Sequence, residues 1–216
     1  MDSELCRSWV GRMVSLRTLR FGLWLCVALL GLLIVIWLLT KPEEIPQPSL
    51  TKNTTQLSLS FNLLDHNGNP ITGESMQGKK IAVFFGFTHC PEICPTTLHN
   101  LNYYIQTLAQ EGLKLSGFFV TVDPIRDTPE VLKTHLEDFQ DRITGITGPV
   151  EEISSLLKNW SVYVKIIPLE EPNYTIDHTS SVYLIDERGI LQNVLRYQES
   201  SDEALVKLKQ FVSREP

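Results

Sequence analysis

The chain has 216 residues, 43% of them apolar, which is enough for one domain with a sizeable core plus an appendage. Its formal net charge is −6; residues 1–40 contribute +2, so residues 41–216 carry −8. This acidic balance argues against nucleic acid as a partner, because binding to phosphates requires a basic surface.

Residues 21–39 form an uncharged apolar segment that predicts a membrane anchor. At about 1.5 Å per residue, a helix of this length spans about 28 Å, close to the apolar thickness of a bilayer. Trp24 and Trp37 lie near its ends, and four arginines precede it, so residues 1–20 are expected in the cytoplasm. A cleaved signal peptide is disfavoured, because the apolar run is long and no Ala-x-Ala site follows.

The same charge pattern predicts a single-pass protein of an inner membrane. Its bulk would face the periplasm, or the mitochondrial intermembrane space if the source is a eukaryote. An Arg- and Ser-rich transit peptide is not evident, which favours a bacterial inner membrane. Residues 40–56 are rich in proline and polar residues, so we expect an extended linker there and a domain over residues 57–216.

Strands alternate with helices along this domain, which predicts a layered α/β domain with a partly parallel sheet. Antiparallel hairpins are expected at its two ends, the first over residues 57–71, and a polar loop over 168–177. The expected strands are 57–63, 81–87, 115–122, 143–147, 162–167, 181–186 and 190–195. The expected helices are 96–110, 130–139, 149–160 and 202–214.

Two cysteines, Cys90 and Cys94, lie where the buried strand 81–87 turns into a helix. Reactive groups gather at the carboxyl ends of such strands, and the N–H groups of a helix start favour a thiolate. Proline follows each cysteine, so we expect Cys94 to be the N-cap and Pro95 the first helical residue. A thiolate pair binds a soft metal such as Cu(I) or exchanges with disulfides, and the spacing leaves both functions open.

A histidine as third ligand would also make Cu(II) acceptable, but the positions of the histidines alone select none. His66 lies in a predicted turn, His135 on a charged helix where we expect it to be solvated, and His99 on a helix face toward solvent. His89 points away from the cysteine pair if the strand continues to alternate. His178 ends the polar loop before an apolar strand.

Three separated motifs follow one another in the chain: GFTHCPEICP at 86–95, TVDPIRDT at 121–128 and DHT at 177–179. In this order they resemble the Sco/SenC family of membrane-anchored copper proteins of cytochrome c oxidase assembly. The resemblance implies a thioredoxin-like fold over roughly residues 55–213. It also implies copper, as Cu(I) or Cu(II), bound by Cys90, Cys94 and His178. Glu92 departs from the aspartate that is usual in the family, and we expect this change to be harmless.

The resemblance further implies a role in building the dinuclear copper centre of cytochrome c oxidase subunit II. The protein would deliver copper, reduce the cysteines of that subunit, or do both, with other copper chaperones or thiol reductants as further partners. Asp123 and Asp127, in the second motif, are interpreted as loop and helix-start residues, with a role near the metal or toward a partner as the alternative.

Two other functions compete with copper delivery. A thiol–disulfide oxidoreductase of the cell envelope would use Cys90 and Cys94 without copper. A peroxidase of the same broad fold would place one cysteine near Thr88 and Arg126, but a second cysteine and two prolines fit that reaction poorly.

Overall fold

A computed structural model describes residues 16–39, 55–139, 142–170 and 172–214. The predicted N-terminal tail up to residue 15 and the linker residues 40–54 lie outside the described residues. The chain divides into two compact units, residues 1–47 and 48–216, and each is considered by itself.

In the first unit, helix α1 (Leu16–Leu39) covers the whole predicted anchor. Its side chains from Leu23 to Ile34 are exposed. Within the described part of the chain, no helix meets the length and apolarity needed to cross a membrane. The anchor at 21–39 therefore stays a prediction.

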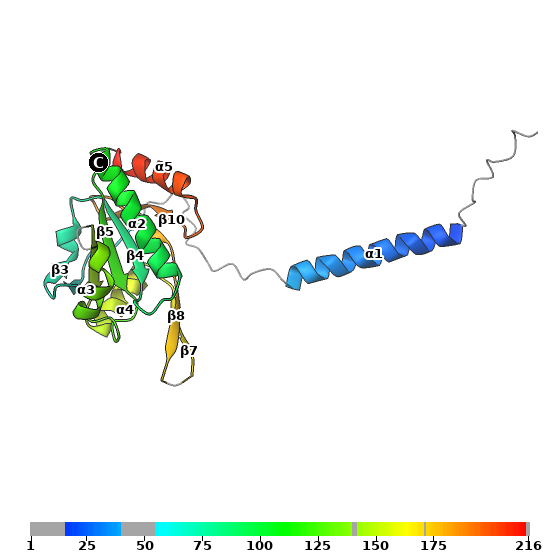
Figure 1. The fold of residues 1–216 in the computed structure, drawn as a ribbon, viewed down its shortest axis with the longest axis horizontal. Coiled ribbons are helices and arrows are strands. Elements are labelled where there is room, and N and C mark those ends of the chain that lie inside the picture. Colours follow the sequence, from blue (N-terminus) through cyan, green and yellow to red (C-terminus); the bar gives the residue numbers. More distant parts are fainter. Residues whose placement is uncertain (1–15, 40–54, 140–141, 171, 215–216) are drawn as a thin grey trace, which may run out of the picture. The chain divides into compact units, whose positions relative to one another are not determined.

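The second unit is built on a mixed sheet (Figure 1). The sheet has eight strands in the order β1-β10-β9-β4-β5-β6-β2-β3. Its centre is parallel: β4 (Ile81–Gly86), β5 (Ser116–Thr121) and β6 (Ile143–Thr147) pair side by side. The antiparallel strands around them are β1 (Thr55–Gln56), β2 (Asn62–Asp65), β3 (Pro70–Thr72), β9 (Val182–Ile185) and β10 (Ile190–Leu195). The predicted α/β class with terminal hairpins is confirmed.

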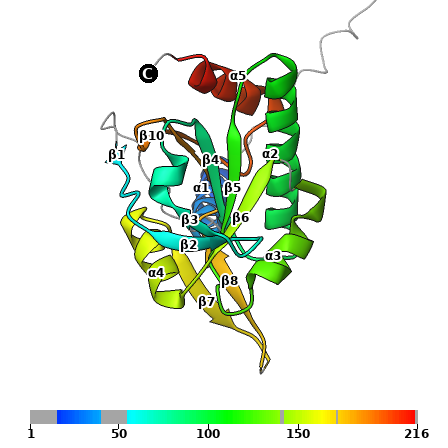
Figure 2. The ribbon, with the colours of Figure 1, turned by 90° about the vertical axis from the view of Figure 1, so that its left-hand side faces the viewer.

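Helices α2 (Ile93–Gln110), α3 (Pro129–His135), α4 (Val150–Asn159) and α5 (Ser201–Val212) pack on this sheet, with 3-10 turns η1 (Gly73–Met76) and η2 (Glu137–Phe139). Figure 2 shows α2 beside α5. Thr128 caps α3 by accepting from the N–H of Val131, as its position before Pro129 predicts. The α3 helix ends earlier than expected, and η2 covers the remaining residues.

The prediction of a strand at 57–63 is wrong, because β1 ends before this stretch and β2 begins only at Asn62. Its alternation is nevertheless real: Leu57 and Phe61 are buried while Ser58 and Ser60 are exposed. The carbonyl of Ser58 accepts from the indole N–H of Trp160 at 2.8 Å. The pattern therefore predicted burial correctly, but it could not predict which groups satisfy the backbone.

The predicted polar loop 168–177 is also wrong, since most of it belongs to a hairpin. Strands β7 (Val164–Pro168) and β8 (Tyr174–His178) form a separate two-stranded antiparallel sheet. This hairpin projects from the body of the domain (Figures 1 and 2). The stretch 168–177 contains two prolines and several polar residues, so it resembles a loop although the backbone of both strands is paired.

Candidate metal centre

The two cysteines lie in the turn that joins β4 to α2. All six residues of β4 are buried, and after Phe87 the chain turns back, with the N–H of Cys90 donating to the carbonyl of Phe87 at 3.2 Å. The helix begins at Ile93 with Glu92 as its N-cap, so the prediction of Cys94 as N-cap is wrong. Pro95 lies within the first turn, where its missing N–H would have no helical partner in any case.

The early helix start brings the first turn directly over the other cysteine. The N–H of Cys94 points to Sγ of Cys90 at 3.4 Å. Cys94 is fully buried and Cys90 is 9% exposed, so Cys90 lies on the solvent side of the pair. Both are free thiols.

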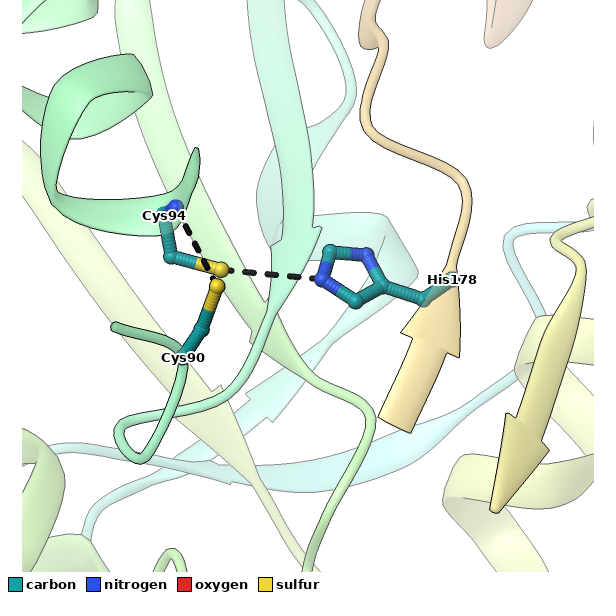
Figure 3. A group of neighbouring side chains, drawn as sticks. All are labelled: Cys90, Cys94 and His178. Carbon is teal, nitrogen blue, oxygen red and sulfur yellow. Dashed lines mark hydrogen bonds between the residues drawn. The ribbon is translucent and has the colours of Figure 1, made fainter. Parts of the chain in front are cut away.

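His178 completes a group of three. Its Nε2 lies 3.6 Å from Sγ of Cys94, and the donor atoms of Cys90, Cys94 and His178 all lie within 4.8 Å of one another. Figure 3 shows the imidazole at the end of a strand, pointing toward the two sulfurs. The structure therefore brings together the three residues that the family resemblance selected.

The imidazole of His178 is held in one orientation. Its Nδ1 lies 3.0 Å from the carbonyl of Thr179, which can only accept, so Nδ1–H donates there and Nε2 is turned toward the sulfurs. The rings of Phe84 and Phe87 lie 6.4 and 5.7 Å from the imidazole, measured between centroids. This apolar wall limits the access of water.

The two thiols differ in acidity. A hydrogen bond from Cys94 is the main reason that the pKa of Cys90 is lowered to about 4; burial opposes this change, while hydrogen bonds from His178 and from the backbone N–H groups of Cys94 and Glu92 support it. The pKa of Cys94 is raised, first because its proton is held in the bond to Cys90 and second because it is buried. Cys90 is therefore the thiolate and Cys94 the thiol of the metal-free pair.

Gly86 is needed for this geometry, a role that was not predicted from its place in the first motif. A Cβ atom at this position would lie 2.8 Å from Sγ of Cys94 and 2.6 Å from Cε2 of Phe119. A glycine at the end of a buried strand is a known signal of close approach, and it could have indicated this role.

The acidic residues of the second motif are buried beside the site. Asp127 is fully buried and accepts from the hydroxyl and the N–H of Thr88 at 2.6 and 3.1 Å, and from the hydroxyl of Thr121 at 2.7 Å. Asp123 is 3% exposed and forms an ion pair with Arg126. Thr88 and Arg126 are thus bound to aspartates, which does not favour the peroxide site considered from the sequence.

The other histidines have separate environments. His66 is a buried turn residue whose Nδ1 accepts from the N–H of Gly145 at 2.8 Å. His99 is exposed, as expected, and His89 is exposed as well. The prediction that His135 is solvated is wrong: it is partly buried, its ring lies 5.9 Å from that of Phe119, and burial lowers its pKa.

The comparisons with known proteins agree on one family. The family described as SCO1/SenC matches residues 50–213. The mitochondrial protein SCO2 of Saccharomyces cerevisiae is 39% identical over 177 residues, which cover 81% of this chain and 59% of that protein. The chain thus spans less than two thirds of the length of this relative.

Two solved structures described as copper-bound share the fold. Yeast Sco1 with copper bound has a TM-score of 0.69 at 35% identity, covering 75% of this chain and 92% of that one. ScoI of Bradyrhizobium japonicum with copper bound has a TM-score of 0.64, also at 35% identity, covering 70% of this chain and 96% of that one.

Proposed function

This chain belongs to the SCO1/SenC family, and from that premise we propose that it binds copper through Cys90, Cys94 and His178 during cytochrome c oxidase assembly. The recipient is the dinuclear copper centre of oxidase subunit II, to which copper is delivered as cargo. The observation that carries this proposal is the convergence of two sulfurs and one imidazole nitrogen within 4.8 Å.

The donor set fits copper. Two thiolates suit soft Cu(I), and an added imidazole makes Cu(II) acceptable as well. The group contains no carboxylate, whereas hard cations such as Ca²⁺ and Mg²⁺ require oxygen ligands. Cys90 is the more exposed of the two cysteines, so a partner's thiolate reaches the cargo from its side.

The location that we propose is the outer face of an inner membrane, in the periplasm or the mitochondrial intermembrane space. The support is the apolar segment 21–39, the arginines that precede it and the mitochondrial relative in yeast. The proline-rich stretch 40–56 would let the domain reach an oxidase subunit held in the same membrane.

The copper content of the purified full chain tests the proposal. We expect about one copper per chain, loss of both oxidation states in Cys90→Ser/Cys94→Ser, and preferential loss of Cu(II) in His178→Ala, because two thiolates still hold Cu(I). Cys26→Ser is the control, since Cys26 lies in α1 outside the site. If the double cysteine variant kept its copper, this function would be excluded.

The asymmetry of the two thiols favours a second function, reduction of the partner's cysteines. The Cys90 thiolate would attack one sulfur of a partner disulfide, and the other sulfur would leave as a thiolate. Cys94 would then lose its proton and attack Sγ of Cys90, so that two electrons pass to the partner and a Cys90–Cys94 disulfide remains. A thiol reductant must supply two electrons to restore the pair.

Reduction is tested with a disulfide-containing peptide of subunit II. A potential of the cysteine couple below about −300 mV would make it a good reductant, whereas one near −120 mV would make it an oxidant. If reduction is independent of copper, His178→Ala should still reduce the peptide, with a change in rate no larger than the loss of the hydrogen bond from His178 to the Cys90 thiolate explains. Loss of reduction in that variant would tie the reaction to the metal centre.

A further inference from the structure

His178 lies on a strand that is not part of the main sheet. It is the last residue of β8, and β8 pairs with β7 in a separate two-stranded sheet. Two-stranded hairpins are marginally stable on their own in water. The distance between His178 and the cysteines therefore depends on how this hairpin is fastened to the body of the domain.

Tyr174, the first residue of β8, attaches the hairpin to the body of the domain. Its hydroxyl donates to Oδ1 of Asp123 at 2.8 Å. The guanidinium carbon of Arg126 lies 3.7 Å from the centre of the tyrosine ring, and Nη1 of Arg126 donates to the backbone carbonyl of Tyr174 at 3.1 Å. The side chain, the ring face and the backbone of one residue are thus all bound by the loop between β5 and α3.

That loop is itself rigidly held. Asp123 is buried and pairs with Arg126, and its N–H donates to the hydroxyl of Thr121 at 2.9 Å. Its carbonyl accepts from the N–H groups of Arg126 and Asp127 at 3.2 and 2.9 Å. Tyr174 therefore binds a fixed surface rather than a mobile side chain.

The same loop also holds the cysteine side of the site. Asp127 binds the hydroxyl and N–H of Thr88, two residues before Cys90. The guanidinium carbon of Arg126 lies 5.7 Å from the ring centre of Phe87, whose ring in turn packs edge-on against His178. One loop consequently sets the position of both parts of the metal centre.

We propose that Tyr174 is a positioning residue, a latch that holds the β7–β8 hairpin closed and keeps Nε2 of His178 within reach of the two sulfurs. This inference rests on the proposed copper function. Without the latch, the hairpin loosens and the third ligand is lost part of the time. Two thiolates suffice for Cu(I) but not for Cu(II), so the latch acts selectively on Cu(II).

The test compares Tyr174→Phe and Tyr174→Leu in the full chain, titrated separately with Cu(I) and Cu(II) ions. Phe loses only the hydroxyl contact to Asp123, while Leu also loses the ring over Arg126. We expect Cu(II) affinity to fall about tenfold in Tyr174→Leu and less in Tyr174→Phe, as for other residues that orient a ligand. Cu(I) affinity should stay unchanged in both.

Two further measurements separate a latch from a merely structural role. The nitrogen hyperfine splitting in the Cu(II) EPR spectrum of Tyr174→Leu should move toward that of His178→Ala. In the metal-free chain, amide hydrogen exchange in β8 should become faster. Tyr163→Leu is the matched control, because Tyr163 precedes the same hairpin and is 41% exposed; it should change neither measurement.

The outcomes are distinguishable. If Tyr174→Leu binds Cu(II) like the wild type while His178→Ala does not, the latch is refuted and the copper function stands. Equal losses of Cu(I) and Cu(II) in Tyr174→Leu would also refute it, since they indicate general misfolding. If His178→Ala and the double cysteine variant both bind copper normally, the copper function itself fails.

Discussion

The carboxylate of Asp127 lies 2.6 Å from the hydroxyl of Thr88, and this contact joins the β5–α3 loop to the turn that carries Cys90. The same carboxylate accepts from the N–H of Thr88 and from the hydroxyl of Thr121. Because Asp127 is fully buried, no water replaces a lost partner. The interpretation of Asp127 as a helix-start residue was therefore incomplete: it shapes the cysteine turn.

Asp127→Asn should destabilise the protein by about 1–3 kcal/mol, because hydrogen bonds to a charged carboxylate are stronger than those to a neutral amide. The amide oxygen can still accept from the N–H of Thr88 and the hydroxyl of Thr121 at the position of Oδ2, but its NH2 group then meets the hydroxyl of Thr88, which must rotate. Urea unfolding of the full chain measures the loss. Asp138→Asn, at an exposed acid in η2, is the control and should change stability little; equal effects in both variants would contradict this account.

Gly86→Ala should lower both stability and copper content. The new Cβ would meet Sγ of Cys94 and the ring of Phe119 within 2.8 Å, and overpacking of this kind costs about 1–3 kcal/mol. Gly112→Ala is a matched control: Gly112 has φ +75° after α2, so alanine costs about 1–2 kcal/mol there through backbone strain. Its copper content should stay normal, and a parallel copper loss would show that stability alone governs binding.

Alkylation of Cys90 by iodoacetamide should be nearly independent of pH between about pH 5 and 8, because a thiol with a lowered pKa is already ionised there. Removing the hydrogen bond from Cys94 in Cys94→Ala removes the largest cause of the shift. The pKa of Cys90 should then rise, and the alkylation rate should increase with pH across this range. Mass spectrometry of the labelled peptide measures the rate, and identical profiles would contradict the assigned cause.

Because of His66, the free energy of unfolding should decrease as pH falls below about 6.5, the ordinary histidine pKa. Burial lowers the pKa of His66 in the folded state, and its Nδ1 must stay unprotonated to accept from Gly145. Below pH 6.5 the unfolded chain therefore binds more protons than the folded chain, so stability is lost until the folded pKa is passed.

The pH effect of His66 is measured by urea unfolding at several pH values in wild type and His66→Gln. Glutamine keeps a neutral acceptor for Gly145 but does not titrate, so the slope of unfolding free energy against pH should decrease. The slope should decrease by at most the contribution of one proton, which is about 1.4 kcal/mol per pH unit. An unchanged slope would assign the pH dependence to other groups, of which His135 has the same sign.

Much of the fold followed from local patterns in the sequence. The apolar run predicted a buried strand at 81–87, which is β4 (Ile81–Gly86), and Thr128 with Pro129 predicted the start of α3. The hairpin of β9 and β10 and the terminal helix α5 also lie where they were expected. These features depend on side chains close together in the chain, whose periodicity and turn chemistry can be read directly.

The sequence by itself determined that two thiol groups lie together at a strand-to-helix turn, because four positions of chain leave them little freedom to separate. The residues alone did not decide which histidine is the third metal ligand, and only the family resemblance selected His178. The tertiary structure decided the rest: the hairpin that brings His178 to 3.6 Å from Cys94, 84 positions earlier, and the latch of Tyr174 on Asp123. Contacts over such separations depend on strand register and on packing of the whole domain, and no local pattern records either.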